Sequence, residues 1–372
     1  MPRPQTTVTV SPALARRGTA TDTGLCFLLY AGATGTLTPV ECYSAADATT
    51  SNAPAAIAAW VGDVLEQGAP KVILLRAAAV NAAAVTQAEW TTALALLTPA
   101  YGPGQVIAPG VSSAAVRAAL LAHAAANGNR TVFLDIDRVD TAATGAAAAT
   151  GLAAAGGATR AGMFAGWAIV PATGGTTREL PASLVAAGLV ARGDAYNGHA
   201  NHAPASDQGR GAGVVTRGIG VVTGYSDADT DTLYNAGVNT IRMVNGAPTM
   251  TGWVSVSSDS RYRQLNWGRL DMQVAAAAVA LMYQFQHQNI DAKNQLYAKV
   301  EAALRGFLLT LWTRGALYGA TAAAAFDVDV AGVNTPTNVA AGSLNAAMLL
   351  SKAAHVEQSN VNVTTTIAGG AA

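Results

Sequence analysis

Lys71-Val72-Ile73-Leu74-Leu75-Arg76 places four consecutive branched apolar residues between two cations. A continuous apolar run of this kind is typical of a parallel strand, because helices cover both faces of a parallel sheet. A second run, Leu25-Cys26-Phe27-Leu28-Leu29-Tyr30, lies upstream. Between the two, Pro54–Gln67 carries apolar residues at helical spacing and is followed by Gly68, a residue suited to ending a helix. The succession of strand, helix and strand predicts a βαβ unit.

The same alternation continues to Pro171. The predicted helices are Thr86–Leu97, a helix capped by Ser112 that runs to Ala126, and Thr141–Ala155. The predicted strands are Gln105–Ala108, Arg130–Asp135 and Gly166–Val170. Short connections between alternating strands and helices predict an α/β domain with a mostly parallel sheet.

After Pro171 the pattern changes and predicts a mixed α+β domain. Pro181–Arg192 is either a short helix or an extended crossing, and Tyr196–Gly213 has the composition of a loop. Further elements are expected at Val214–Val222, Thr230–Ala236, Asn239–Val244, Arg269–Asn289, Lys293–Thr313 and Ala325–Val330. We therefore divide the chain into a first segment (1–21), an α/β domain (22–195), a mixed α+β domain (196–355) and a last segment (356–372).

Both ends of the chain carry β-strand patterns. The residues concerned are Thr7, Val8, Thr9 and Val10 near the start, and Val361, Asn362, Val363, Thr364 and Thr365 near the end. Termini usually fray, so a strong β pattern there needs a sheet edge to join. The edge belongs either to the same chain or to a neighbouring copy, and addition to a neighbour builds rings or open helices.

The composition excludes several classes of protein. The chain has 372 residues, with 22 Lys and Arg against 22 Asp and Glu, and only 12% of its residues are charged. A nucleic-acid binder needs clustered cations to neutralise phosphates, and no long basic run occurs. The longest uncharged stretches, 141–159 and 272–290, are not apolar enough to predict a membrane span, and residues 1–6 lack the apolar core of a secretion signal. Cys26 and Cys42 give neither a disulfide framework nor a zinc site, so we expect folding in a reducing compartment.

Motifs that could carry chemistry are incomplete. Asp227–Asp231 has the spacing of a calcium loop but lacks its glycine and its final glutamate. Gly213–Gly218 has Walker-like spacing without the lysine and hydroxyl residue that hold phosphate and magnesium, and Gly209, Gly211 and Gly213 lack the third glycine of a dinucleotide site. His199 and His202 lie in a polar loop. We expect no catalytic residue, no cofactor and no metal.

Asp135 and Asp137 are the remaining candidates for a site. They follow a predicted strand, and α/β enzymes bind ligands beyond the carboxyl ends of their strands. Such acids are also ordinary loop residues. An enzyme or ligand-binding protein that uses this edge of the sheet therefore stays open as an alternative.

Several short motifs occur in the order found in one known family. Leu233–Arg242 resembles a run "LN..GVN.IR", and Trp267-Gly268-Arg269 resembles "WG.RT" without its Thr. Other matching segments are Pro181-Ala182-Ser183, Ala187–Asp194, Ala203-Pro204-Ala205, Phe307-Leu308, Gly315–Gly319, Phe326-Asp327-Val328 and Ala353–Val363. From about residue 181 to 367 the chain resembles the contractile tail sheath proteins of myophage tails, phage-like bacteriocins and related injection machines. The earlier residues resemble them only in topology.

This resemblance implies a structural subunit of a virion tail, assembled in the host cytoplasm as a helical homopolymer around a tail tube protein. The sheath would contract to drive the tube through the target envelope for genome ejection, and it would also contact baseplate and tail terminator proteins. The resemblance makes residues 22–195 an outer domain and 196–355 an inner domain, with both termini as arms that complete sheets in neighbouring subunits. It implies no enzymatic activity, no nucleic-acid contact and no membrane insertion.

Charged tube contacts are also implied, and Lys293, Lys299 and Arg305 are the candidates, although their spacing does not form one helical stripe. A solvated helix face explains these cations equally well. A non-contractile virion structural protein is a second alternative to the sheath.

Overall fold

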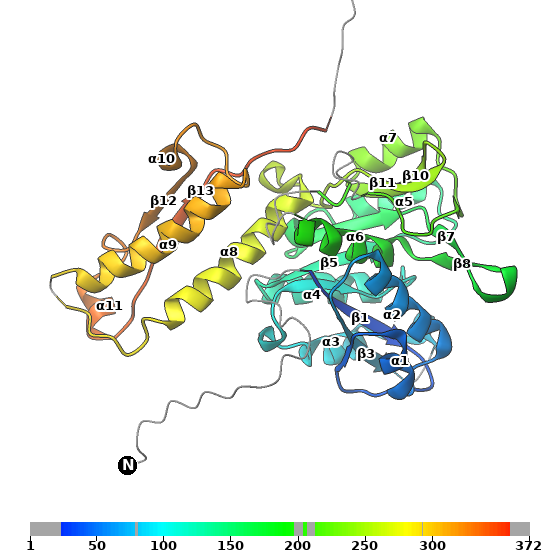
Figure 1. Cartoon of the computed structure of the whole chain (residues 1–372), viewed down its shortest axis with the longest axis horizontal. Coiled ribbons are helices and arrows are strands. Elements are labelled where there is room, and N and C mark those ends of the chain that lie inside the picture. Colours follow the sequence, from blue (N-terminus) through cyan, green and yellow to red (C-terminus); the bar gives the residue numbers. More distant parts are fainter. Residues whose placement is uncertain (1–23, 79–80, 197–203, 207–212, 292, 358–372) are drawn as a thin grey trace, which may run out of the picture.

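The computed structural model describes residues 24–78, 81–196, 204–206, 213–291 and 293–357. Within these residues the largest sheet has eight strands and forms the centre of the main body, residues 24–274 (Figure 1). Its six central strands are parallel, and both edge strands are antiparallel to their neighbours. The spatial order is β11 (Ala247–Thr251), β10 (Val238–Val244), β6 (Ala161–Ala165), β5 (Arg130–Asp135), β4 (Gly104–Ile107), β1 (Leu25–Ala31), β3 (Val72–Ala78) and β2 (Val40–Cys42).

Helices cover both faces of this sheet. One face packs against α1 (Ala45–Thr50), α2 (Ala55–Gln67), α6 (Ala182–Tyr196) and the start of α8 (Leu265–Tyr283). The other face packs against α3 (Gln87–Ala95), α4 (Ala114–Ala126), α5 (Ala142–Thr150) and α7 (Asp227–Asn235). Successive residues of β1 enter opposite layers: Cys26 and Leu28 face the first, and Phe27 and Leu29 face the second. This division explains the continuous apolar run, and it confirms the predicted α/β class.

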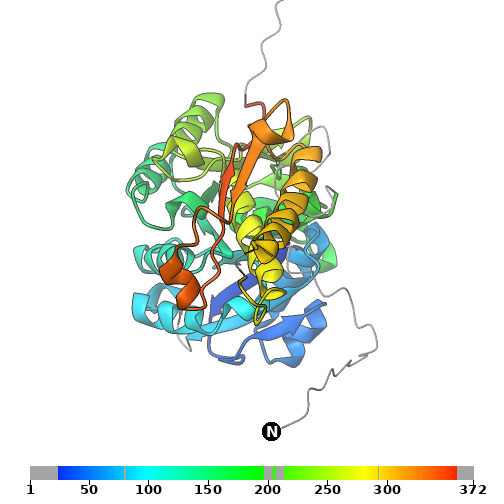
Figure 2. The same ribbon diagram turned by 90° about the vertical axis from the view of Figure 1, so that its left-hand side faces the viewer.

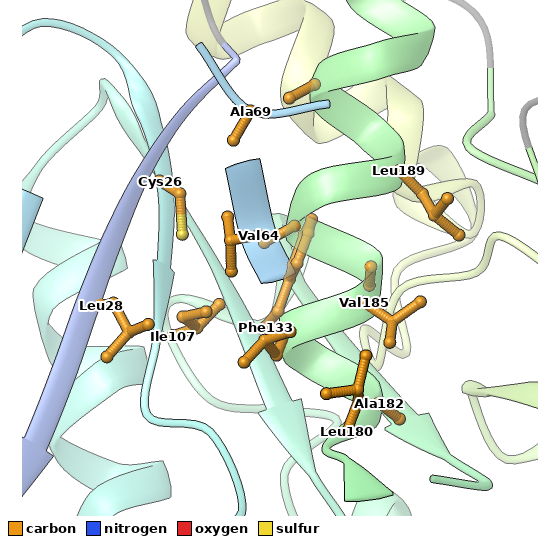
Figure 3. Close-up of a cluster of buried hydrophobic side chains, with 14 of the residues drawn as sticks. Cys26, Leu28, Val64, Ala69, Ile107, Phe133, Leu180, Ala182, Val185 and Leu189 are labelled. Carbon is orange, nitrogen blue, oxygen red and sulfur yellow. The ribbon is translucent and has the colours of Figure 1, made fainter. Parts of the chain in front are cut away.

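The layer beneath α6 is built from residues in register across the strands. Leu28 pairs with Ile107, and Ile107 pairs with Phe133, so their side chains form a row. Figure 3 shows this row beside α6, whose Val185 and Leu189 belong to the same cluster. Because α6 is buried along nearly all of its length, its sequence shows no polar stripe, and periodicity alone could not distinguish a helix from an extended crossing.

Several boundaries differ from the prediction. A strand, β6, was missed, because Ala161 and Gly162 weaken its apolar pattern. The predicted strand at 166–170 is instead β7 (Ala168–Pro171), which forms a small sheet with β8 (Thr177–Leu180) and β9 (Gly220–Val221). Ser113 rather than Ser112 caps α4, α5 ends at Thr150, and only β9 forms in the predicted strand region 214–222.

The remaining elements form a distal unit, residues 275–350, around a third core. After α8 leaves the body, α9 (Gln295–Thr313) packs beside it, followed by α10 (Ala322–Ala325), β12 (Phe326–Asp329), α11 (Pro336–Ala340) and β13 (Ala347–Leu350). Figure 2 looks onto this unit, with α9 beside the β12–β13 pair. The predicted helix 293–313 is α9, and its apolar stripe is buried, at Leu296, Val300, Leu304, Leu308 and Leu311.

The predicted domain boundary at 195/196 does not coincide with the packing. β10 and β11 follow that boundary in the chain but belong to the same sheet as β1 and β6. The division between cores instead falls along α8, which starts against the body and ends in the distal unit. Among the described helices, none has both the length and the apolar character that crossing a membrane requires.

Candidate functional site

The Asp135 carboxylate forms structural hydrogen bonds within the subunit. It accepts hydrogen bonds from the Ser183 amide at 2.7 Å, the Ser183 hydroxyl at 2.7 Å and the Gly110 amide at 2.8 Å. These bonds join the end of β5 to the start of α6, and the side chain is fully buried. Asp137, by contrast, is exposed and accepts from the Ser112 hydroxyl at 3.3 Å. The two acids therefore do not form an acid/base pair, and this geometry removes the support for an enzyme site at the sheet edge.

Asp135 and His123 should affect acid stability in opposite directions. Burial raises the pKa of Asp135 to about 6, so between pH 6 and 3.8 the folded state binds a proton that the unfolded state does not. Burial, together with the Arg130 charge, lowers the pKa of His123 to about 4, so between pH 6.5 and 4 the unfolded state binds the extra proton. Acidification therefore strengthens folding through Asp135 and weakens it through His123.

The two opposite pH effects partly cancel in the wild type, so we expect substitution of either residue to expose the pH dependence that the other gives to stability. When the pH falls from 7 to 5, His123 should lower the free energy of unfolding of the wild type by about 2 kcal/mol, and His123→Gln should abolish this decrease. Over the same range Asp135 should raise the free energy of unfolding by about 1 kcal/mol, and Asp135→Asn should abolish this increase. Urea unfolding at both pH values measures the slopes, with the exposed Asp231→Asn as control. Identical pH slopes in all four proteins would contradict this assignment.

The other sequence candidates serve structural roles. Asp229 and Ser226 form a capping box at the start of α7, and Val214 bridges to Thr249 on the β11 edge. Cys26 and Cys42 are both buried; burial raises the pKa of the Cys26 thiol and raises that of Cys42 to about 11, so neither is available to cross-link subunits. Among the described residues, no group of three or more His, Cys, Asp or Glu side chains could hold a metal. His199, His202, Gly209 and Gly211 lie outside the described residues.

The β12–β13 pair is a small two-stranded sheet, and residues 316–318 pair only with the continuation of β13 at 351–353. Its register runs from Phe326 opposite Leu350 to Asp329 opposite Ala347, and within the described residues no third strand pairs with it. Phe326 and Val328 face the α9 core, whereas Asp327 and Asp329 point to solvent. Leu349 is 74% exposed. Unpaired strand edges are templates for another strand, and an isolated two-stranded sheet is marginally stable.

The predicted tube-facing cations do not form one group. Lys293 and Lys299 are exposed at the start of α9. Arg305 is engaged within the subunit, because it donates to Glu301 at 2.7 Å and to Asp327 at 2.7 Å. The hydrogen bond from Arg305 to Asp327 lowers the pKa of the Asp327 carboxyl. Arg305 therefore ties α9 to β12.

An uncharged, partly apolar face of α8 was not predicted as a contact. Val279 and Tyr283 lie one turn apart on α8 and are 72% and 70% exposed. They extend an exposed strip that begins at Ala275, in the distal half of the helix. The signal for this face in the sequence is the uncharged stretch 272–290. The predicted arm residues, 7–10 and 361–365, lie outside the described part of the chain.

The fold matches solved structures over nearly its whole length. A chain in the cryo-EM structure of the anti-feeding prophage (AFP) baseplate is 18% identical, with 99% of both chains covered and a TM-score of 0.73. A chain of the PVC sheath complex, an extracellular contractile injection system in its contracted state, is 16% identical over 99% of this chain and 98% of its own, with a TM-score of 0.72. The sheath tail protein of Desulfitobacterium hafniense is 10% identical over 87% and 93%, with a TM-score of 0.61.

No family model and no curated protein matches the sequence. At these identities the likeness establishes the fold, which is that of sheath proteins from contractile injection systems and tails. The resemblance drawn from residues 181–367 is confirmed at this level. It also extends through the α/β region, where the sequence had indicated topology alone.

Proposed function

We propose that this chain is a structural subunit of a contractile sheath, which polymerises as a helical tube around an inner tail tube. The observation that carries the proposal is the shared fold over 99% of this chain with a contracted sheath complex and with a chain of a baseplate structure. Another chain of this fold belongs to the AFP helical sheath in its contracted state, which supports self-assembly, and a subunit in this role needs no enzymatic activity.

In this proposal the terminal segments 7–10 and 361–365 are arms that add strands to neighbouring subunits. The open β12–β13 pair supports this role, because an added strand would satisfy unpaired backbone groups and cover Leu349. A strand donated from one site to a different site on the next copy is a heterologous contact, which propagates as an open helix. Many identical contacts along the lattice would make contraction cooperative.

The distal unit is the proposed tube-facing part. Lys293 and Lys299 are exposed and are the candidates for charged contacts with the tube. The Val279–Tyr283 strip of α8 is a candidate for an apolar contact. Arg305 is the weakest of the three predicted cations, since it already pairs with Asp327. Baseplate and terminator proteins would meet the two ends of the helical tube, in a tail assembled within the host cytoplasm, and contraction would drive envelope penetration and genome ejection.

Negative-stain electron microscopy of the purified full-length chain tests this function. We expect long, hollow, striated tubes, either from this chain by itself or after its co-expression with the tail tube protein. Discrete small particles under both conditions would reject a sheath.

A further inference from the structure

Residues 351–357, called here the strap, carry the chain from the distal unit back to the main body. The strap begins by extending the distal sheet, where Lys352 bridges to Leu317 and the Ala353 amide donates to the Ala316 carbonyl at 3.0 Å. It then runs to the start of α8, where the described chain ends at Glu357 (Figure 1). Any segment beyond Glu357 therefore leaves from this point on the body.

Gln264 grips the strap with both ends of its side-chain amide. Its Nε2 donates to the His355 carbonyl at 3.2 Å and to the Glu357 carboxylate at 3.0 Å. Its Oε1 accepts from the His355 amide at 3.1 Å. The Gln264 side chain thus pairs with the backbone of His355 as a neighbouring strand would. Gln264 is 4% exposed, although it occupies the N-cap position of α8 without capping that helix through its side chain.

A second grip lies one helical turn further along α8. The Trp267 indole donates to the Ala353 carbonyl at 2.7 Å. Lys352 donates to Asp271 at 2.6 Å, and its ammonium lies 4.4 Å from the centre of the Tyr262 ring. Only 16% of the Lys352 side chain is exposed. These contacts hold the strap near its start, while Gln264 holds it near its end.

Arg263 completes the fastening at Glu357. Its guanidinium lies 3.7 Å from the Glu357 carboxylate and over the ring of Tyr234 on α7, at 5.2 Å. Three elements of the body therefore converge on the last described residues: α7, the loop before α8, and α8 itself.

We propose that Gln264, Trp267 and Lys352 are positioning residues that fix where the C-terminal arm leaves the subunit and in which direction. This inference rests on the proposed sheath function, in which residues 361–365 must reach a neighbour. An arm that starts from a fixed point samples a smaller volume than one that starts from a free strap. Its effective concentration at the neighbouring edge is therefore higher, and less conformational entropy is lost on docking.

Gln264→Glu tests the grip with almost no change in shape. The carboxylate cannot donate to the His355 carbonyl and repels Glu357, whereas an acid at a helix N-terminus does not disfavour α8. Trypsin cleavage after Lys352 in the monomer reports release of the strap, measured by mass spectrometry of the fragment 353–372. We expect cleavage at least about tenfold faster than in the wild type. Gln286→Glu, an exposed site near the end of α8, is the matched control and should leave the rate unchanged.

The double variant Gln264→Glu/Glu357→Gln separates positioning from general loosening. It restores a donor opposite the new carboxylate, so most of the wild-type protection should return. The yield of pelletable tubes, which Gln264→Glu should lower, should rise with it. Glu357→Ala, at the edge of the described chain, should also speed cleavage without lowering the melting temperature. Cleavage of Gln264→Glu at the wild-type rate, or accelerated cleavage that the double variant fails to reverse, would overturn the proposal. If the wild type forms no tubes, the sheath function fails, and the protease rates still decide the grip.

Discussion

A chain that ends at Glu357 is expected to fold as the full-length protein does and to form no tubes. The deletion removes the β-patterned residues 361–365 but none of the packed cores, which lie within residues 25–350. In the proposed lattice each subunit loses a strand and each neighbour keeps an open edge, so the defect repeats at every contact. The yield of pelletable polymer should fall to background, while circular dichroism and the melting temperature stay close to those of the full-length monomer.

Matched variants localise this effect. Removal of Gly369–Ala372 alone shortens the chain without touching the β pattern and should leave assembly intact. Val363→Pro should abolish tubes nearly as well as the full deletion, because proline removes a donor from the strand ladder. Deletion of Met1–Ser11 should act like the C-terminal deletion if both arms are needed. Normal tubes from both truncations would reject strand exchange as the basis of the lattice, while leaving the sheath fold untouched.

The layered α/β body was predictable because its strands must be apolar on both faces. Residues 25–30 and 72–75 are short, continuous apolar runs of the kind that buried parallel strands require, and the capped helices between them indicated the alternation. β6 was not predicted because one of its residues, Gly162, has low strand propensity and is there for packing. A Cβ at this position would lie 2.6 Å from the Leu265 side chain and 2.9 Å from the Phe164 ring. A requirement for space leaves no periodic signal in the sequence.

The Leu233–Arg242 motif of the family resemblance contains residues that the fold of the subunit requires. In the Leu233–Arg242 run, Gly237 has φ +89° in a tight approach to Ser255. The Asn239 side chain is fully buried, donates to the Met163 and Val254 carbonyls and accepts from the Val254 amide. These demands come from the packing of the fold itself, so this motif indicates the fold rather than a contact surface.

Contact surfaces were correspondingly harder to predict. The charges of α9 were singled out because charge is visible in a sequence, yet Arg305 is used inside the subunit. The Gln264 grip could not be foreseen, since it joins residues about ninety positions apart and uses an amide that carries no motif. The apolar strip of α8 appears only when the fold shows which side of the helix the cores leave uncovered.

Arg269→Ala is expected to destabilise the folded subunit by roughly 3–5 kcal/mol, a large part of the stability of an ordinary domain. Arg269 forms two hydrogen bonds to Asp194, at 3.1 and 2.5 Å, and the two side chains are 0% and 3% exposed. Removing the cation leaves a carboxylate buried between α6 and α8 without its charge partner. Asp194→Ala should lower the free energy of unfolding by a similar amount, because it leaves the buried Arg269 guanidinium without the Asp194 carboxylate.

The pair should contribute geometry more than net stability. Desolvating two ions costs nearly as much as their attraction returns, so the double variant Arg269→Met/Asp194→Leu should recover most of the loss in chemical unfolding. The pair joins α6, at the centre of the body, to the helix that supports the distal unit, and its fork-shaped contact fixes the rotation of α8. The double variant should therefore match the wild type in free energy of unfolding but assemble into fewer or irregular tubes. Recovery of stability together with fully regular tubes would show that apolar packing alone orients α8. Failure of the double variant to recover stability would show that the ion pair itself stabilises the fold.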